Sequence, residues 1–254
     1  MAFVQNVPFF SIILSMFSGI ISSVLPEKPA KWLNTAVITL VGAMSAWLLS
    51  YMLKAGGSYT FMMGHFPAPW GNEIRAGALE ALMALIFSII MLLSLLGGRK
   101  KLKDEVEITK HNIYYILTDL LLSSLLALIY TNDLFTAYVF VEINTIAACG
   151  LIMIRQNGRT IVAAVRYMIM SLLGSGLLLM GICMLYDLTG HLLMSNIQES
   201  VQQIMQESSY QVPMMITIGL ITVGLSIKSA LFPFHAWLPD AYGYSTVSSA
   251  AMLS

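Results

Sequence analysis

Long apolar runs separated by short polar segments dominate this chain of 254 residues. Seven of the runs are long enough to cross about 30 Å of hydrocarbon, which takes about 20 helical residues. They lie near residues 8–25, 32–53, 76–97, 112–131, 134–154, 161–186 and 212–232. A further run begins near Thr246 and stops at Ser254, so we expect the start of an eighth helix on a truncated chain. The pattern predicts an all-α polytopic membrane protein with seven full transmembrane helices.

The composition indicates a membrane protein and excludes several other classes. Hydrophobic residues make up 57% and charged residues 10% of the sequence, and the mean hydropathy is +0.78. Ordinary soluble domains carry about 25% charged residues. The net charge is zero and the charges form short clusters between apolar runs, so we expect no nucleic-acid partner. The run from Phe9 to Leu25 lacks a basic start and a small-residue cleavage site, so it is predicted to remain as a span.

Cysteine and histidine form no recognisable cofactor or metal motif in the sequence. Cys149 and Cys183 fall inside apolar runs, without the spacing of a disulfide framework or a CxxC site. The histidines are scattered along the chain: His65, His111, His191 and His235. We therefore expect no bound cofactor and no metal ion, and any redox chemistry would belong to partner subunits.

Lysine and arginine are distributed unevenly between alternate connections. Nine of them fall on one side: Lys28, Lys31, Arg99, Lys100, Lys101, Lys103, Lys110, Arg155 and Arg159. The other side holds only Lys54 and Arg75. Because cytoplasmic connections carry the excess of positive charge, the sequence predicts a multi-pass protein of the cell membrane. Residues 98–110 would lie inside and the N-terminus outside.

The last full span, at 212–232, carries a lysine and is followed by a proline. A continuous helix would place the ammonium of Lys228 deep in hydrocarbon, at a cost of about 2.5 to 3.5 kcal/mol. Pro233 has no N–H and excludes the carbonyl of Ser229 from the helical hydrogen bonds, so we expect the helix to break there. Irregular backbone at membrane depth is tolerated beside protein or a hydrated cavity, which indicates an ion path. The alternative is an ordinary helix end from which the lysine snorkels to the interface.

Glu142 is a second ionisable residue near the middle of a predicted span. It lies about nine residues from Asp133 and about thirteen from Arg155, or roughly 13 to 20 Å from either end. One helical face holds the polar side chains of this span: Tyr138, Glu142, Thr145 and Cys149. We therefore expect the glutamate to face protein and not lipid. A protonated glutamate that only joins two helices is the alternative.

Two more charged residues lie inside predicted spans. Arg166 is about five residues from the start of its span, where it either reaches the interface or faces the bundle. Asp119 shares a four-residue spacing with His111, Tyr115 and Ser123. These four side chains form a polar stripe, or else His111 is a boundary residue and Asp119 alone is intramembrane, with an unknown partner.

Several segments resemble one family of membrane subunits. The segment PFHAWLPDAY, from Pro233 to Tyr242, resembles the signature of the antiporter-like subunits of respiratory complex I, Mrp sodium/proton antiporters and membrane-bound hydrogenases. LFTAYVFVEINTIAACGLI resembles the fifth helix of the family, with its glutamate at Glu142. The next span resembles the sixth helix, with Arg166 where the family carries a lysine. FPAPWGNEIRAG at 66–77 reads as an interfacial turn with anchoring aromatics and also resembles the segment before the third helix, although an acidic residue that often follows it is missing.

The resemblance implies one half of a subunit with 14 helices, in which helices 4–8 and 9–13 form inverted repeats around broken, lysine-bearing helices. Residues 1–110 would hold three N-terminal helices and the basic connection, and residues 111–254 the first repeat with a truncated last helix. The implied function is translocation of protons, or of sodium ions, in a redox-driven complex such as a membrane-bound hydrogenase or a complex I-like oxidoreductase. The alternatives are a component of an Mrp-type cation/proton antiporter and a non-conducting scaffold subunit.

We expect proton transfer to depend on the coupling of Glu142 and Lys228. A carboxylate within reach stabilises the ammonium of Lys228, and withdrawal of the carboxylate favours release of a proton. His235 is the candidate relay toward the cytoplasm, because histidine is the side chain most often used to carry protons at physiological pH. Asp240 is expected to hold its loop through hydrogen bonds to backbone groups. Partners are expected to be other hydrophobic subunits, one of which completes the second repeat, and the isolated chain is expected to transport nothing.

Overall fold

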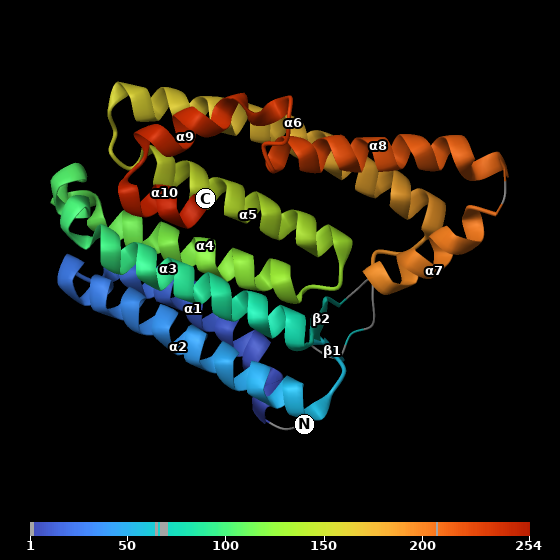
Figure 1. Ribbon diagram of the computed structural model, residues 1–254, viewed down its shortest axis with the longest axis horizontal. Coiled ribbons are helices and arrows are strands. Elements are labelled where there is room, and N and C mark those ends of the chain that lie inside the picture. The colour runs from blue at the N-terminus through green and yellow to red at the C-terminus, as the bar shows by residue number, and fades with distance from the viewer. Residues whose placement is uncertain (1–2, 64–65, 67–70, 207) are drawn as a thin grey trace.

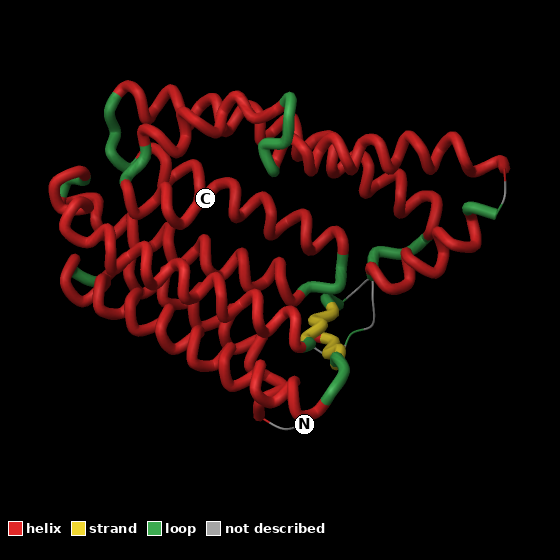
Figure 2. Tube along the Cα trace, in the orientation of Figure 1, coloured by secondary structure: helices red, strands yellow, loops and turns green. Residues whose placement is uncertain are grey.

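Helices make up nearly all of the fold and run alternately in opposite directions (Figures 1 and 2). The computed structural model describes residues 3–63, 66, 71–206 and 208–254. Within these ranges, seven helices are long and apolar enough to cross a membrane: α1 (Val7–Val24), α2 (Glu27–Ala55), α3 (Ala78–Glu105), α4 (His111–Tyr130), α5 (Leu134–Met153), α6 (Gly158–Thr189) and α8 (Gln211–Lys228). The predicted polytopic helical fold with seven spans is confirmed.

The remaining elements are short. They are the strands β1 (Tyr59–Met62) and β2 (Glu73–Ala76), the helices α7 (Met194–Ile204), α9 (Leu238–Tyr244) and α10 (Val247–Leu253), and 3-10 turns at Phe3–Asn6, Ile108–Lys110, Ser208–Tyr210 and Phe234–Trp237. Of these, α7 forms the greater part of the connection between α6 and α8.

An antiparallel hairpin replaces the simple interfacial turn that we expected between the second and third spans. β1 pairs with β2, with Tyr59 opposite Ala76. The segment leaves the helical pattern, so its backbone N–H and C=O groups pair with one another instead. Of the predicted aromatic and proline motif, residues 67–70, which include Trp70, lie outside the described residues.

The connections gather at two opposite ends of the helices (Figure 1). The basic end holds the α1–α2, α3–α4 and α5–α6 connections, and the hairpin end holds β1, β2 and α7. The nine lysines and arginines that we assigned to one side lie toward the basic end. Seven of them lie within helices and not in a connection: Lys28 and Lys31 are in the first turns of α2, Arg159 is in the first turn of α6, and α3 continues to Glu105 through Arg99, Lys100, Lys101 and Lys103. Lysine and arginine favour helix and stabilise a helix C-terminus, which explains the extension.

Two apolar cores hold the described helices together. The larger lies among α1 to α5 and includes the fully buried Tyr114 and Tyr130. The smaller joins α5 and α6 to the segment after α8, around Ile152, Ala163 and Trp237. α10 begins where the eighth helix was expected and packs against α3. These contacts hold α5 and α6 in position along the bundle. α8 is placed against these two helices.

Glycines allow α8 to pack closely against α6. A Cβ atom added at Gly224 would lie 2.8 Å from the carbonyl oxygen of Gly174. A Cβ atom added at Gly181 would lie 2.6 Å from the side chain of Ile221. Small residues at such a crossing let two backbones approach within a membrane. The crossing brings the C-terminal end of α8 beside the middle of α5.

Candidate ion-translocation site

The candidate site lies where α8 ends, at Lys228. A turn, the 3-10 segment Phe234–Trp237 and α9 follow, and α9 continues alongside α6 beyond the end of α8 (Figure 1). The carbonyl of Ser226 accepts the N–H of Leu231 at 2.9 Å. The carbonyl of Ile227 accepts the indole N–H of Trp237 at 3.4 Å. Two carbonyls freed by the end of the helix therefore bond within the protein, as non-helical backbone at membrane depth requires.

The ammonium of Lys228 and the carboxylate of Glu142 form an ion pair, with 2.7 Å between Nζ and Oε1. Nζ also donates to Oγ1 of Thr145 at 2.9 Å. On α6, Oγ of Ser175 donates to the same oxygen of Glu142 at 2.6 Å. Glu142 is near the middle of the 20-residue α5, so the network joins three helices at mid-membrane depth.

Both members of the pair are largely shielded from solvent. The exposed fraction of the side chain is 11% for Lys228 and 25% for Glu142. At 2.7 Å and an effective dielectric constant of about 20, the Coulomb attraction is about 6 kcal/mol before the cost of desolvation. Either charge alone would be costly at this depth. Because the two charges neutralise each other, both are tolerated inside the helices.

A polar hollow of ≈ 140 Å³ lies beside Lys228. Its lining comes from α5, α6, α8 and the segment after α8: Asn144, Ala148, Ile152, Tyr167, Lys228, Trp237, Tyr242 and Leu253. An amide, two phenols and an ammonium on its wall supply hydrogen-bonding groups, and its volume is sufficient for water. The lysine therefore has a polar space on one side and the carboxylate of Glu142 on another.

Comparison with known proteins identifies the family. The family described as NADH:quinone oxidoreductase/Mrp antiporter, TM, matches residues 131–254, which contain the ion pair. NADH-quinone oxidoreductase subunit N of Desulforudis audaxviator is 29% identical over 252 residues, which are 98% of this chain and 49% of that protein. A Na(+)/H(+) antiporter subunit of Bacillus subtilis is 27% identical over 203 residues, 80% of this chain and 40% of that protein. This chain is similar to the antiporter-like membrane subunits over nearly its whole length, and its residues 131–254 match their family.

A solved structure supports the fold of this antiporter-like chain. The Mrp complex from a Dietzia species contains a chain that superimposes with a TM-score of 0.82 at 21% identity, over 100% of this chain and 46% of that one. At that identity the likeness concerns the fold alone. This antiporter-like chain spans about half the length of the relatives it matches.

Arg166 and Asp240 form a second ion pair in the antiporter-like chain. The guanidinium of Arg166 contacts the carboxylate of Asp240, with 61% and 28% of the side chains exposed. We expected Asp240 to bond to backbone groups, but its partner in the structure is the side chain of Arg166, so that expectation was wrong. Arg166 is at the periphery of the bundle, and its charge is matched by a residue 74 positions away that the sequence did not connect with it.

His235 is not brought to the ion pair by a direct contact. It lies exposed on the turn after α8, where its ring stacks on Phe232 with 5.7 Å between centroids. Among the described hydrogen bonds, none joins His235 to Glu142 or Lys228. Pro233 lies in the same turn. Any relay through His235 would therefore have to pass along the turn and not by direct contact.

Asp119 is fully buried among α1, α2 and α4, and the structure supplies the partners that the sequence left unknown. Oγ of Ser18 and Nδ2 of Asn34 each donate to its carboxylate at 2.8 Å. His111 is the first residue of α4, so it does lie at a helix boundary, and it is buried there with its Nδ1 2.7 Å from the carboxylate of Glu27. The four residues of this spacing are all buried, with His111 at the end of the helix and Asp119 inside the bundle.

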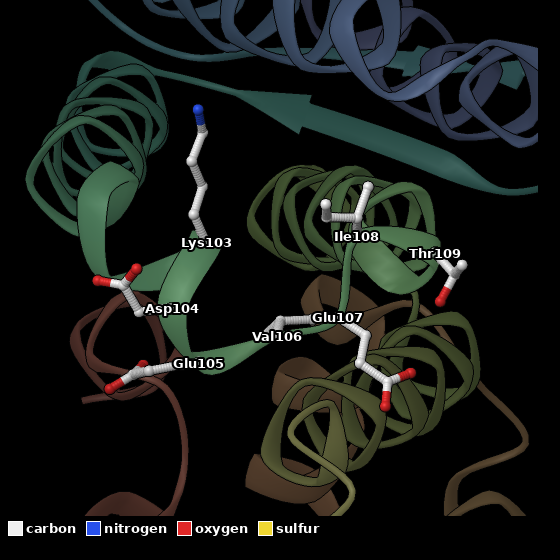
Figure 3. Close-up of a pocket in the computed structure, with 7 residues that line it drawn as sticks. All are labelled: Lys103, Asp104, Glu105, Val106, Glu107, Ile108 and Thr109. Carbon is white, nitrogen blue, oxygen red and sulfur yellow. The ribbon is translucent and has the colours of Figure 1, made fainter.

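A wider hollow of ≈ 530 Å³ at the basic end does not form a comparable site. Its lining is the end of α3 and the segment that follows it toward α4, residues 103–109 (Figure 3). Figure 3 shows Lys103 and Glu107 pointing in different directions, while Asp104 and Glu105 point to the side opposite Glu107. Because these charged groups do not converge, they present no common binding point for an ion.

Proposed function

We propose that this chain translocates ions, protons or sodium, as a subunit of a redox-driven membrane complex. The observation that carries the proposal is the 2.7 Å ion pair between Glu142 and Lys228 at the end of α8, in the middle of the membrane. The likeness to NADH-quinone oxidoreductase subunit N supports a redox complex. The likeness to the Na(+)/H(+) antiporter subunit of Bacillus subtilis supports a second candidate, a component of a multisubunit cation/proton antiporter.

In the proposed mechanism the separation of the ion pair drives proton movement. While Glu142 lies against Lys228, the ammonium keeps its proton and the hydroxyls of Thr145 and Ser175 fix the geometry. When the carboxylate moves away, the uncompensated ammonium is costly and releases its proton into the polar hollow beside it. His235, exposed on the turn after α8, is then the candidate that passes the proton on toward the cytoplasm.

Arg166, Asp240 and Pro233 have supporting roles in this proposal. The ion pair between Arg166 on α6 and Asp240 on α9 ties the segment after the break to α6. Pro233 prevents α8 from continuing through that segment as one regular helix. Together they keep the break in place beside Glu142.

We also propose the placement of the chain in its membrane and complex. The basic end faces the cytoplasm and the N-terminus faces outward, because positive charge is retained inside. Residues 1–110 act as an N-terminal unit, and residues 111–254 as the first repeat. Hydrophobic partner subunits, one of which supplies the second repeat, cover α8, whose Val212 and Met215 are 64% and 70% exposed.

The test uses the intact complex that contains this chain, reconstituted into sealed vesicles. We expect Glu142→Gln and Lys228→Met each to abolish ion flux, while the exposed Glu199→Gln on α7 leaves it unchanged. Flux that requires an electron donor supports the redox complex, whereas flux driven by a cation gradient alone supports the antiporter. Normal flux in both pair variants would refute the proposal and favour a non-conducting scaffold. The isolated chain should show no flux above empty vesicles.

A further inference from the structure

Asp119 is a buried acid for which the proposed mechanism has no role. It projects from α4 to the place where α1 and α2 pack on that helix, and its exposed fraction is 0%. Oδ2 accepts a hydrogen bond from Ser18 on α1, and Oδ1 accepts one from Asn34 on α2, each at 2.8 Å. α1 passes close by, since a Cβ atom added at Gly19 would lie 3.5 Å from Cβ of Asp119.

Nothing described in the structure compensates a negative charge on Asp119. Across the described residues, no lysine, arginine or histidine nitrogen lies within 4.0 Å of its carboxylate. α1 presents Ser18 to it and α2 presents Asn34. On α4 the nearest titratable groups are Tyr115, one turn away, and His111, which is paired with Glu27. Glu142, by contrast, has Lys228. A buried carboxylate without a cation is costly, so the neutral acid is the form that suits this position.

The amide oxygen of Asn34 is available to accept a hydrogen bond from the neutral acid of Asp119. Its Nδ2 donates to Asp119 at 2.8 Å and to the carbonyl of Tyr115 at 3.4 Å, a long contact that rotation of the amide would give up, while its Oδ1 is buried without a hydrogen-bond partner in the described structure. Buried polar atoms are rarely left unpaired. A protonated carboxyl has one O–H to donate, and rotation of the amide would present its oxygen to that donor. Asn34 can therefore satisfy Asp119 in either state, as a donor to the carboxylate or as an acceptor from the acid.

We propose that Asp119 is a proton-binding site within the N-terminal helices, distinct from the Glu142–Lys228 pair, in which Asn34 exchanges donor for acceptor as the proton binds. Two more buried oxygens without partners, Oγ of Ser22 and Oδ1 of Asn112, lie between this site and the basic end. We assign a proton and not sodium, because Ser18 and Asn34 each direct a hydrogen-bond donor at the carboxylate at 2.8 Å, and a cation bound there would have to displace them.

The test is infrared difference spectroscopy on the intact complex in vesicles, near neutral pH and in light and heavy water. We expect the carbonyl stretch of a protonated carboxyl in the wild type, shifted in heavy water and missing in Asp119→Asn. The exposed Asp187→Asn on α6 is the control and should keep the band, as should Glu142→Gln. Asn34→Leu, which keeps Asp119 but removes the amide, should move the band toward that of a less strongly bonded acid.

Three results would overturn the proposal. The first is a spectrum of Asp119→Asn identical to that of the wild type, which would mean that the carboxyl is ionised. The second is a band that disappears when sodium chloride is added, which would indicate a cation site. The third is a band unmoved in Asn34→Leu, a readout that does not depend on the folding of the Asp119 variant. None of these results would bear on ion flux through the Glu142–Lys228 pair.

Discussion

The ion pair between Glu142 and Lys228 makes a quantitative prediction about stability. Glu142→Gln keeps the shape of the side chain and one hydrogen-bonding oxygen but removes the charge, so it leaves the ammonium of Lys228 uncompensated at mid-membrane depth. Lys228→Met keeps the length of that side chain and leaves the carboxylate uncompensated. The double variant removes both charges and leaves neither partner unpaired.

The magnitude follows from the geometry. Of the roughly 6 kcal/mol of Coulomb attraction at 2.7 Å, desolvation offsets a large part. Removal of one partner of a buried pair typically lowers the free energy of unfolding by about 3 to 5 kcal/mol. Replacement of both partners by neutral groups of similar volume is often nearly neutral. Because the coupling is the difference between the double variant and the sum of the two single variants, we expect it to be at least about 3 kcal/mol, at or above the upper end of the usual range.

The assay is equilibrium unfolding of the purified protein in mild detergent, followed for the wild type, both single variants and the double variant. The chain supplies a matched control in the exposed pair Arg166–Asp240, for which Arg166→Met and Asp240→Asn should give a coupling below about 1 kcal/mol. The coupling free energy for Glu142 and Lys228 should exceed that of the control pair. If it does not, the argument that burial strengthens the coupling of this pair is refuted.

Two further predictions test the helix crossing and the orientation. Gly224→Ala places a Cβ atom 2.8 Å from backbone of α6, so it should lower the free energy of unfolding by about 1 to 3 kcal/mol in the same assay. Gly219→Ala, on the same helix but with nothing within 4 Å, is the control and should be tolerated. Equal effects of the two substitutions would contradict the close crossing. Lys103→Cys should resist labelling by a membrane-impermeant thiol reagent added outside sealed cells, and ready labelling would reverse the orientation.

The sequence predicted the spans well because a membrane imposes a simple rule. Each crossing takes about 20 apolar residues in a helix, so hydropathy alone locates it. The main errors were at the ends, where that rule no longer applies. α3 continues into its basic segment, and residues 59–62 and 73–76 pair as strands, since outside the hydrocarbon local hydrogen bonding and charge decide the structure.

The partners of the charged residues were harder to predict than the residues themselves. Hydropathy reveals a charge inside an apolar run, so Glu142, Lys228 and Asp119 stood out. Helical periodicity gives the face of a helix on which a residue lies, but not the neighbouring helix that the face meets. Ser18 lies 101 positions from Asp119, and Asp240 lies 74 positions from Arg166. Only the packing of the helices in three dimensions brings such pairs together.

The position of Lys228 at the end of a helix explains why it bonds to side chains and not to backbone. The last carbonyls of a helix lack intrahelical partners and attract cations. Here the carbonyl of Ser226 is occupied by the N–H of Leu231 and that of Ile227 by the indole of Trp237. With these carbonyls engaged, the ammonium is directed to Glu142 and Thr145 on α5. The turn after α8 thus does more than interrupt a helix, because it leaves the lysine dependent on a carboxylate on another helix. A pair held between two helices can be separated when these helices move relative to each other.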